Sequence, residues 1–297
     1  MQNNITDEKI KFLETTANDI RISIIEMLVS AGSGHSAGPL GMADVFTAFY
    51  FHILRHDPKN PQMPERDRVV LSNGHINPVL YATMAHAGYF PVKELLTLRK
   101  FKTRLQGHPH REFLPMLETS SGPLGAGLSQ TVGMAIADRM DKVSGRFIYC
   151  FTGDGELDEG QNWEAMMLAS KYKLGNLIMI VDRNNIQIDG NTEDVMPLDP
   201  LVNKLESFGF HVEEINGHDF SNIIEAVGKA QSVSNKPSAI VARTIPGKGV
   251  SFMERDYKWH GNPPGTEIAG EPPKSEQTKI ALHDLRTLGG QIKSEHQ

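Results

Sequence analysis

The 297-residue chain contains one cysteine, Cys150, so no disulfide can form within it. This cysteine lies in an apolar run, where it would act as a small buried hydrophobe. No apolar run approaches the roughly 18 residues of a membrane-spanning helix. The segment from Met1 to Asp7 is polar, unlike a secretory signal peptide. We therefore expect a cytoplasmic protein with no membrane partner.

Neither sign of charge dominates the chain. Thirty-six acidic and 30 basic residues give a formal net charge of -6. Because the two signs are interspersed, they do not form the basic footprint that a nucleic acid requires. We therefore expect no nucleic-acid partner, and anionic ligands would have to be bound by local groups. The length is enough to bury a large core, in one large α/β domain or two smaller ones.

The stretch from Phe147 to Gly190 is the most informative part of the sequence. An apolar run at 147–151 is followed by a Gly-Asp-Gly turn, a predicted helix over 157–173 and a second apolar run at 177–181. Strand, helix and strand in about 30 residues form one βαβ unit. The two strands should therefore be parallel, with a right-handed crossover. Similar alternation after residue 200 predicts an α/β fold, with a parallel sheet and helices on both faces.

The other predicted elements follow from periodicity and from the positions of glycine and proline. We expect further helices at 7–31, 42–54, 78–87, 93–104, 130–142, 201–208, 220–232 and 278–292, and further strands near 66–72 and at 211–216 and 238–245.

Polar residues follow both strands of the central unit. Asp154 lies just past the first strand and Asn184 just past the second. The ends of adjacent strands are about 4.8 Å apart, so both side chains should reach one crevice. Hard oxygen ligands in small number suit Mg²⁺, which usually keeps phosphate oxygens and water as further ligands. Gly153 and Gly155 leave room for a diphosphate. A tight turn and an ordinary Asn-Asn turn are the structural alternative, but the order and spacing together favour the metal site.

The order and spacing of these two segments resemble those of a known family. Gly-Asp-Gly followed after about 30 residues by Asn-Asn is similar to the pattern of thiamine-diphosphate enzymes. The fuller text GDGELDEGQNWEA…LGNLIMIVDRNNIQIDG resembles the diphosphate-binding domain of transketolase, over roughly residues 10–265. The resemblance implies thiamine diphosphate as cofactor. It also implies Mg²⁺, or another divalent cation such as Ca²⁺ or Mn²⁺, on Asp154, Asn184 and the carbonyl of Ile186.

Other segments resemble the parts of the family that bind the cofactor. A glycine-rich loop with Gly122-Pro123-Leu124 is similar to the family loop that wraps it, and Arg243 stands where the family often carries lysine near the diphosphate. A flexible loop and a solvated arginine are the alternatives. The implied cofactor-binding residues are His75, Gly122, Pro123, Leu124, Gly153, Asp154, Gly155, Glu156, Asn184, Ile186, Arg243 and His260.

Four histidines, His35, His75, His108 and His260, lie in predicted loops. A loop histidine is more often merely solvated, packed or capping a helix. Here the segments SGH, NGH, GHP and WHG resemble those of the family, which implies that all four are catalytic. The resemblance places His35 and His260 toward the substrate hydroxyls, and His75 and His108 beside the reacting carbon and the cofactor. Imidazoles suit this because they transfer protons near neutral pH.

The resemblance also implies how the chain is organised. Residues 1–265 would form the diphosphate domain, and 266–297 a linker and a C-terminal helix. Transketolases are more than twice this length and include a pyrimidine-binding domain. The resemblance is thus to the N-terminal subunit of a split transketolase, transferring a two-carbon ketol unit from a ketose (phosphate) to an aldose (phosphate). A separately encoded C-terminal subunit would complete it, as an α2β2 heterotetramer. Glu159 and Glu164 match acids that the family places at a subunit interface.

Two alternatives remain open. The α-subunit of a 2-oxo-acid dehydrogenase shares Gly-Asp-Gly and Asn-Asn and lacks a pyrimidine domain, but it should lack the four histidine segments. A non-catalytic homologue is the second, because Ser36-Ala37 and Ile76-Asn77 depart from residues usual in the family.

Overall fold

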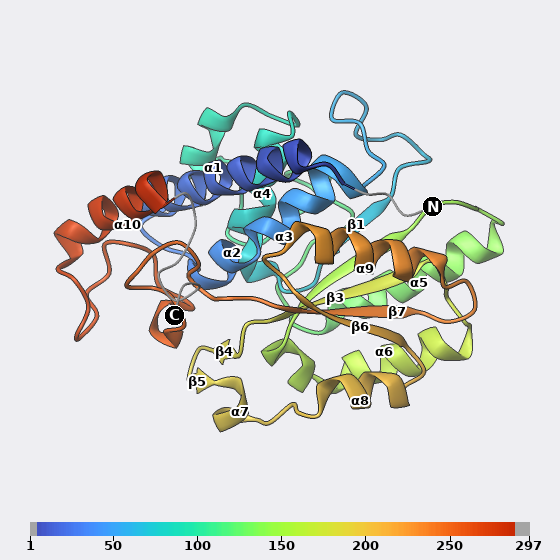
Figure 1. Cartoon of the computed structure of the whole chain (residues 1–297). Helices are drawn as coiled ribbons and strands as arrows, with labels where there is room; N and C mark the ends of the chain where they lie inside the picture. The colour runs from blue at the N-terminus through green and yellow to red at the C-terminus, as the bar shows by residue number, and fades with distance from the viewer. Residues whose placement is uncertain (1–4, 289–297) are drawn as a thin grey trace.

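The computed structural model describes residues 5–288 of the protein. Its centre is a parallel sheet with helices packed on both faces, which confirms the predicted fold class (Figure 1). The strands lie in the order β1 (Arg68–Leu71), β2 (Ile148–Gly153), β3 (Leu177–Arg183), β7 (Ser238–Arg243) and β6 (His211–Asn216).

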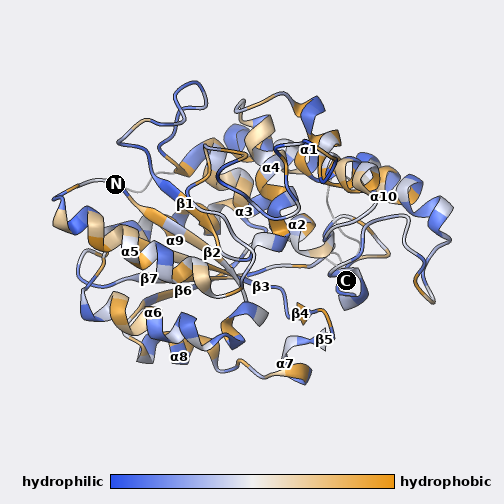
Figure 2. Ribbon diagram, turned by 180° about the vertical axis from the view of Figure 1, so that it is seen from behind, coloured by the Kyte–Doolittle hydropathy of each residue, from blue (hydrophilic) through white to orange (hydrophobic). Residues whose placement is uncertain are grey.

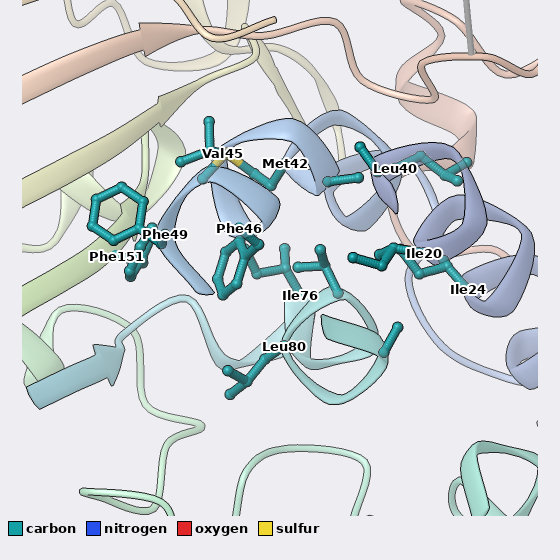
Figure 3. Packing of buried hydrophobic residues seen from close by; sticks show 14 of the residues in the cluster. Ile20, Ile24, Leu40, Met42, Val45, Phe46, Phe49, Ile76, Leu80 and Phe151 are labelled. Atoms are coloured by element: carbon teal, nitrogen blue, oxygen red, sulfur yellow. The ribbon is translucent and has the colours of Figure 1, made fainter. Parts of the chain in front are cut away.

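Side chains of the strands alternate between two cores. Tyr149 and Phe151 of β2 join one buried cluster, and Ile148 and Cys150 join the other. Because both faces are covered, β2 and β3 begin as continuous apolar runs, and hydrophobic colours appear along the middle of the sheet in Figure 2. Figure 3 shows the first cluster, where Phe46 and Phe49 pack near Phe151.

The first face is covered by helices of the N-terminal part and by the helix between β6 and β7. The second is covered by the helix that precedes β2 and by helices that follow β2 and β3. On the first face lie α1 (Asp7–Ala31), α2 (Ala37–Gly41), α3 (Ala43–Ala48), α4 (Asn77–His86) and α9 (Phe220–Ser232); on the second lie α5 (Ala126–Met140), α6 (Gly160–Lys171) and α8 (Leu201–Ser207).

Several predicted elements differ in the structure. The helix expected at 93–104 is wrong: only a 3-10 helix, η3 (Val92–Thr97), forms there, and the following turns hold Arg99 and Lys102 at left-handed φ angles. The helix expected at 42–54 continues beyond α3 as a π-helix, η1 (Phe49–Ile53). The helix expected at 157–173 opens with a separate 3-10 turn, η4 (Gly155–Asp158). Further short elements, absent from the prediction, are η2 (Gly74–Ile76), β4 (Ile186–Gln187), β5 (Gly190–Asn191), α7 (Thr192–Val195) and η5 (Tyr257–Trp259).

The last described helix, α10 (Lys274–Leu288), packs against α1 (Figure 1). Ala281 and Leu285 are buried in the first core, and the Asn18 amide donates to the Leu285 carbonyl at 3.0 Å. The fully buried Gln277 bonds Gly265 and Thr266, so α10 also holds the preceding segment. The part of its predicted range at 289–292 lies outside the described residues. No helix within 5–288 is both long and apolar enough to cross a membrane.

Candidate active site

A cavity of about 320 Å³ opens at the carboxyl ends of β1, β2 and β3. Open α/β sheets bind their ligands at this edge, because the loops that follow the strands converge there. The loops that carry His35 and His108 and the segment after η5 complete the wall. The lining residues are His35, Asn73, His75, His108, Gly122, Leu124, Gly153, Asp154, Gly155, Glu156, Asp182, Asn184, Ile186, Gln187, Ile188, Asp189 and His260.

The carboxylate of Asp154 is fixed by its neighbours. Its Oδ1 accepts from the Gly155 N–H at 2.8 Å, and its Oδ2 accepts from the Asn185 N–H at 2.7 Å. The buried guanidinium of Arg183 lies 3.2 Å from the same Oδ2. Burial raises the pKa of Asp154, and these N–H groups and Arg183 oppose that rise. The carboxylate is therefore oriented before any ligand binds, with lone pairs remaining.

Asn184 is oriented by a second buried carboxylate. Its Nδ2 donates to Asp182 Oδ2 at 2.9 Å, while its Oδ1 accepts from the Ile186 N–H at 3.0 Å. The amide oxygen is thus assigned by the hydrogen-bond network. Asp182 also accepts from the Thr244 hydroxyl. Burial, together with the nearby charge of Asp154, raises the pKa of Asp182 to about 7.

Glu156 ties three elements together. Its Oε1 accepts from the Ser72 hydroxyl at the end of β1 and from the Gly125 N–H at the start of α5. Its Oε2 accepts from the Gly153 N–H at 3.0 Å. Both carboxylate oxygens are therefore engaged within the protein. Glu156 lines the cavity, and its contacts stabilise the positions of the segments that form the cavity floor.

Three histidines form a compact cluster. The ring centres of His35 and His75 are 4.9 Å apart, those of His75 and His260 5.1 Å, and those of His35 and His260 5.5 Å. His108 lines the same cavity. The sequence separates these residues by up to 225 positions, and the fold brings them to one wall.

Burial within the cluster lowers the pKa values of these histidines and so favours the neutral form of each imidazole. Burial, followed by the charges of His260, Arg99 and His108, lowers the pKa of His35 to about 3. Burial lowers the pKa of His260 to about 4 and, with the other histidines, that of His75 well below its usual value. Burial and then Arg99 lower the pKa of His108. Neutral rings can accept a proton at one nitrogen and donate from the other.

The two departures from the family pattern have clear places in the structure. The fully buried Ser36 hydroxyl lies 3.1 Å from the Trp259 carbonyl and 2.7 Å from the Asn262 carbonyl, so it joins the loops of His35 and His260. Ile76 is buried in the first core, and the Asn77 amide donates to the Gln106 carbonyl at 2.9 Å. These residues therefore stabilise the histidine-bearing loops through contacts outside the cavity.

Two of the residues expected at the cofactor do not reach the cavity. Arg243 is exposed at the end of β7, where its Nε lies 2.6 Å from Glu214. Pro123 lies between the lining residues Gly122 and Leu124 but does not itself line the cavity. Conversely, sequence reasoning missed the lining residues Asn73, Asp182, Gln187, Ile188 and Asp189. Asn73 and Asp182 stand at strand ends, as Asp154 does, and that position was the available signal.

The cavity contains polar groups that have no hydrogen-bond partner among residues 5–288. Both polar side-chain atoms of Asn73 are buried and unbonded, as are the Nδ1 atoms of His35 and His260. Buried polar groups are normally satisfied, so these atoms indicate a polar ligand or ordered water. The oxygens of Asp154 and Asn184 on the cavity floor could bind a metal ion that carries a diphosphate. The imidazoles on the wall above could transfer protons beside it. Within 5–288 there is no group of three or more His, Cys, Asp or Glu side chains that could hold a metal ion.

Comparison with known proteins identifies the family. The model of the transketolase thiamine-diphosphate-binding domain matches residues 13–272. The chain belongs to the transketolase family. It is 45% identical over 248 residues to the 6-deoxy-6-sulfo-D-fructose transketolase subunit SqwG of Clostridium sp. (strain MSTE9), covering 84% of this chain and 90% of that protein. It is 38% identical over 275 residues to an apulose-4-phosphate transketolase subunit of Actinobacillus succinogenes, covering 92% and 96%.

Longer transketolases match this transketolase-family chain over part of their length. Human transketolase is 39% identical over 257 residues, which cover 86% of this chain and 40% of the human protein. The crystal structure of transketolase from Campylobacter jejuni matches with a TM-score of 0.80 and 33% identity, over 94% of this chain and 47% of that one. The fold is thus that of the thiamine-diphosphate-binding domain of a family of transferases.

Proposed function

We propose that the chain is the diphosphate-binding subunit of a split transketolase, active only with a separately encoded pyrimidine-domain subunit. The observation that carries this is one cavity that gathers Asp154, Asn184, Ile186 and four histidines. Relatives of similar length are named as transketolase subunits, which supports the two-subunit organisation. We infer an α2β2 heterotetramer, with Glu159 and Glu164, both exposed on the second face, at a subunit interface.

Thiamine diphosphate would supply the nucleophilic carbon and the electron sink for breaking and making the carbon–carbon bond. We propose that Asp154, Asn184 and the Ile186 carbonyl hold Mg²⁺, or Ca²⁺ or Mn²⁺, beside its diphosphate. Gly122 and Leu124 would contact the cofactor from the loop before α5. Pro123 and Arg243 do not line this cavity, and contact of either residue with the cofactor stays a prediction.

The chain's own contribution to the reaction would be proton transfer. Neutral imidazoles at His35 and His260 can take a proton from a substrate hydroxyl and return it to a developing alkoxide. Their Nδ1 atoms have no hydrogen-bond partner among the described residues, so none of these residues fixes the tautomer through that nitrogen. His75 and His108 complete the wall beside the reacting carbon. Substrates would be a ketose donor and an aldose acceptor, and the names of the relatives include a sulfonated sugar and a sugar phosphate.

The experiment is two-carbon transfer by the assembled enzyme. This chain and its partner subunit, with thiamine diphosphate and Mg²⁺, should convert a ketose phosphate and an aldose to the products shortened and lengthened by two carbons. Mass analysis of the products detects both. Cofactor binding without transfer to any acceptor would instead support the non-catalytic alternative.

A further inference from the structure

The side chain of Asn73 lies buried at the cavity without a hydrogen-bond partner among residues 5–288. Only 1% of the residue is exposed, although it lines the cavity. Its amide oxygen and its amide nitrogen are both buried, and neither bonds a described residue. A buried polar atom that stays unpaired loses its hydration without compensation, so proteins rarely retain one. Two such atoms on one side chain therefore indicate a ligand that bonds them.

Backbone contacts account for the position of this residue at the end of β1. The Asn73 carbonyl accepts from the Ile76 N–H at 3.0 Å, and the neighbouring Ser72 N–H donates to the Phe151 carbonyl at 2.8 Å. These bonds tie the segment to η2 and to β2. The side-chain amide adds no hydrogen bond within 5–288 to this arrangement, so the described fold gives no structural reason for an amide here.

The unpaired amide lies beside the turn that carries Asp154. A Cβ built on Gly153 would be 3.8 Å from both the Cβ and the Nδ2 of Asn73, and 3.9 Å from the Cβ of Glu156. The carboxylate of Glu156 accepts from three other groups. The amide of Asn73 is therefore next to the part of the cavity floor that we assign to the metal and the diphosphate.

We propose that Asn73 binds the diphosphate of the cofactor, with Nδ2 donating to a diphosphate oxygen and Oδ1 accepting from a bound water molecule. This inference rests on the proposed function and adds a residue to its cofactor site. An amide suits the position because it offers a donor and an acceptor without a charge. A carboxylate would repel the diphosphate, and an apolar side chain could donate no hydrogen bond to it. Asn73 thus lowers the stability of the free chain and raises its affinity for the cofactor.

The first measurement is the stability of the chain without cofactor, by urea unfolding. Asn73→Leu nearly keeps the shape of the side chain and removes both polar atoms. The unfolding midpoint should stay the same or rise, because no hydrogen bond is lost and a desolvated amide is removed. Asn77→Leu is the matched control. Asn77 is also 1% exposed, but its Nδ2 donates to the Gln106 carbonyl at 2.9 Å, so this change should lower the midpoint.

The second measurement is calorimetry of thiamine diphosphate with Mg²⁺ on the assembled enzyme. Asn73→Leu should raise the Kd of the cofactor about 10- to 100-fold, because a hydrogen bond to a charged oxygen is lost. Weaker binding together with an undiminished unfolding midpoint supports the proposal, since loss of a merely structural residue would lower the midpoint. Wild-type affinity, or a lower midpoint in Asn73→Leu, would overturn it. If the wild-type enzyme binds the cofactor but transfers no ketol unit, the proposed catalysis fails, and these two measurements still decide the role of Asn73.

Discussion

At the scale of single residues, the cavity floor is organised before a ligand arrives. Asp154 is held by two backbone N–H groups and Arg183, and the Asn184 amide is held between Asp182 and the Ile186 N–H. Side chains fixed in this way lose little further freedom on binding an ion. We therefore expect a substitution of Asp154 or Asn184 to act on ligand binding.

The first prediction concerns the metal. Asp154→Asn preserves the shape of the side chain but removes its charge, so it should weaken Mg²⁺-dependent binding of thiamine diphosphate by more than the roughly 10–100-fold typical of lost outer-sphere contacts. Calorimetry on the assembled enzyme measures this. Asp199→Asn, which removes another partner of Arg183 at the exposed side, is the control. Undiminished cofactor affinity in Asp154→Asn would refute the metal assignment.

The second prediction concerns proton transfer. His35→Asn and His260→Asn should each lower kcat by about 10²–10⁴-fold, the usual contribution of a general acid or base, while cofactor affinity changes little. Steady-state kinetics at saturating donor give kcat, and calorimetry gives the affinity. His283→Asn on α10, away from the cavity, should retain wild-type turnover. Full turnover in both cavity variants would show that these imidazoles are only structural.

Sequence reasoning reached those residues whose position follows from a strand end or from a family motif. Asp154 and Asn184 follow the two central strands, and the structure places both on one cavity. Asn73 occupies an equivalent position after β1 and was missed, because an amide before a glycine reads as an ordinary turn. Arg243 is the last residue of β7, but its side chain is directed to Glu214, a preference that the strand pattern does not reveal.

At the scale of elements, the site depends on close packing of α5 against the end of β1. A Cβ on Gly127 would lie 2.4 Å from the Ser72 Cβ and 2.7 Å from the Ser72 Cα. The Gly127 N–H also donates to the Ser72 hydroxyl at 3.0 Å. The same hydroxyl bonds Glu156, so the helix start, the strand end and the cavity floor are coupled through these contacts.

The third prediction compares two glycines of α5. Gly127→Ala should destabilise the chain by about 1–3 kcal/mol, as overpacking does, because the backbone of β1 must move. Gly133→Ala has no heavy atom within 4 Å of the added Cβ, so it should stabilise by about 0.5–1 kcal/mol through helix propensity. Urea unfolding of both variants is the measurement. A neutral or stabilising Gly127→Ala would contradict the described packing.

Periodicity predicted the strongly amphipathic and the fully apolar elements well. The helix over 7–31 and the helix over 220–232 have the predicted bounds. Segment 93–104 misled the prediction because its helix formers are interrupted by left-handed turns at Arg99 and Lys102, a tertiary outcome that residue propensities oppose. The β4–β5 hairpin is too short for any periodic signal.

At the scale of the whole molecule, the buried histidines of the cavity lower the stability of the folded chain as the pH falls. The pKa values of His35 and His260 are about 3 and 4 in the folded chain, against 6.5 for an ordinary imidazole. Below pH 6.5 the unfolded chain binds protons that the folded chain does not, so these groups lower stability as pH falls. Asp182 acts in the opposite sense, because its pKa is raised and its folded form binds a proton first.

The fourth prediction isolates the histidine contribution. Relative to the wild type, His260→Asn should gain stability as pH falls from 6.5 toward 4, by up to about 1.4 kcal/mol per pH unit. The variant retains Asp182, so the opposing contribution cancels in the comparison. Urea unfolding of both proteins at pH 7 and pH 5 measures the difference. A stability difference that is the same at both pH values would contradict burial of a neutral His260.

We propose that this cavity becomes an active site only when a second subunit covers it. The most direct measurement is a titration of this chain with the proposed pyrimidine-domain subunit, following two-carbon transfer and complex mass together. We predict no transfer by this chain alone, a linear rise in activity as partner is added, and saturation at one partner per chain in a complex of two copies of each. Transfer by this chain in the absence of any partner would contradict the account.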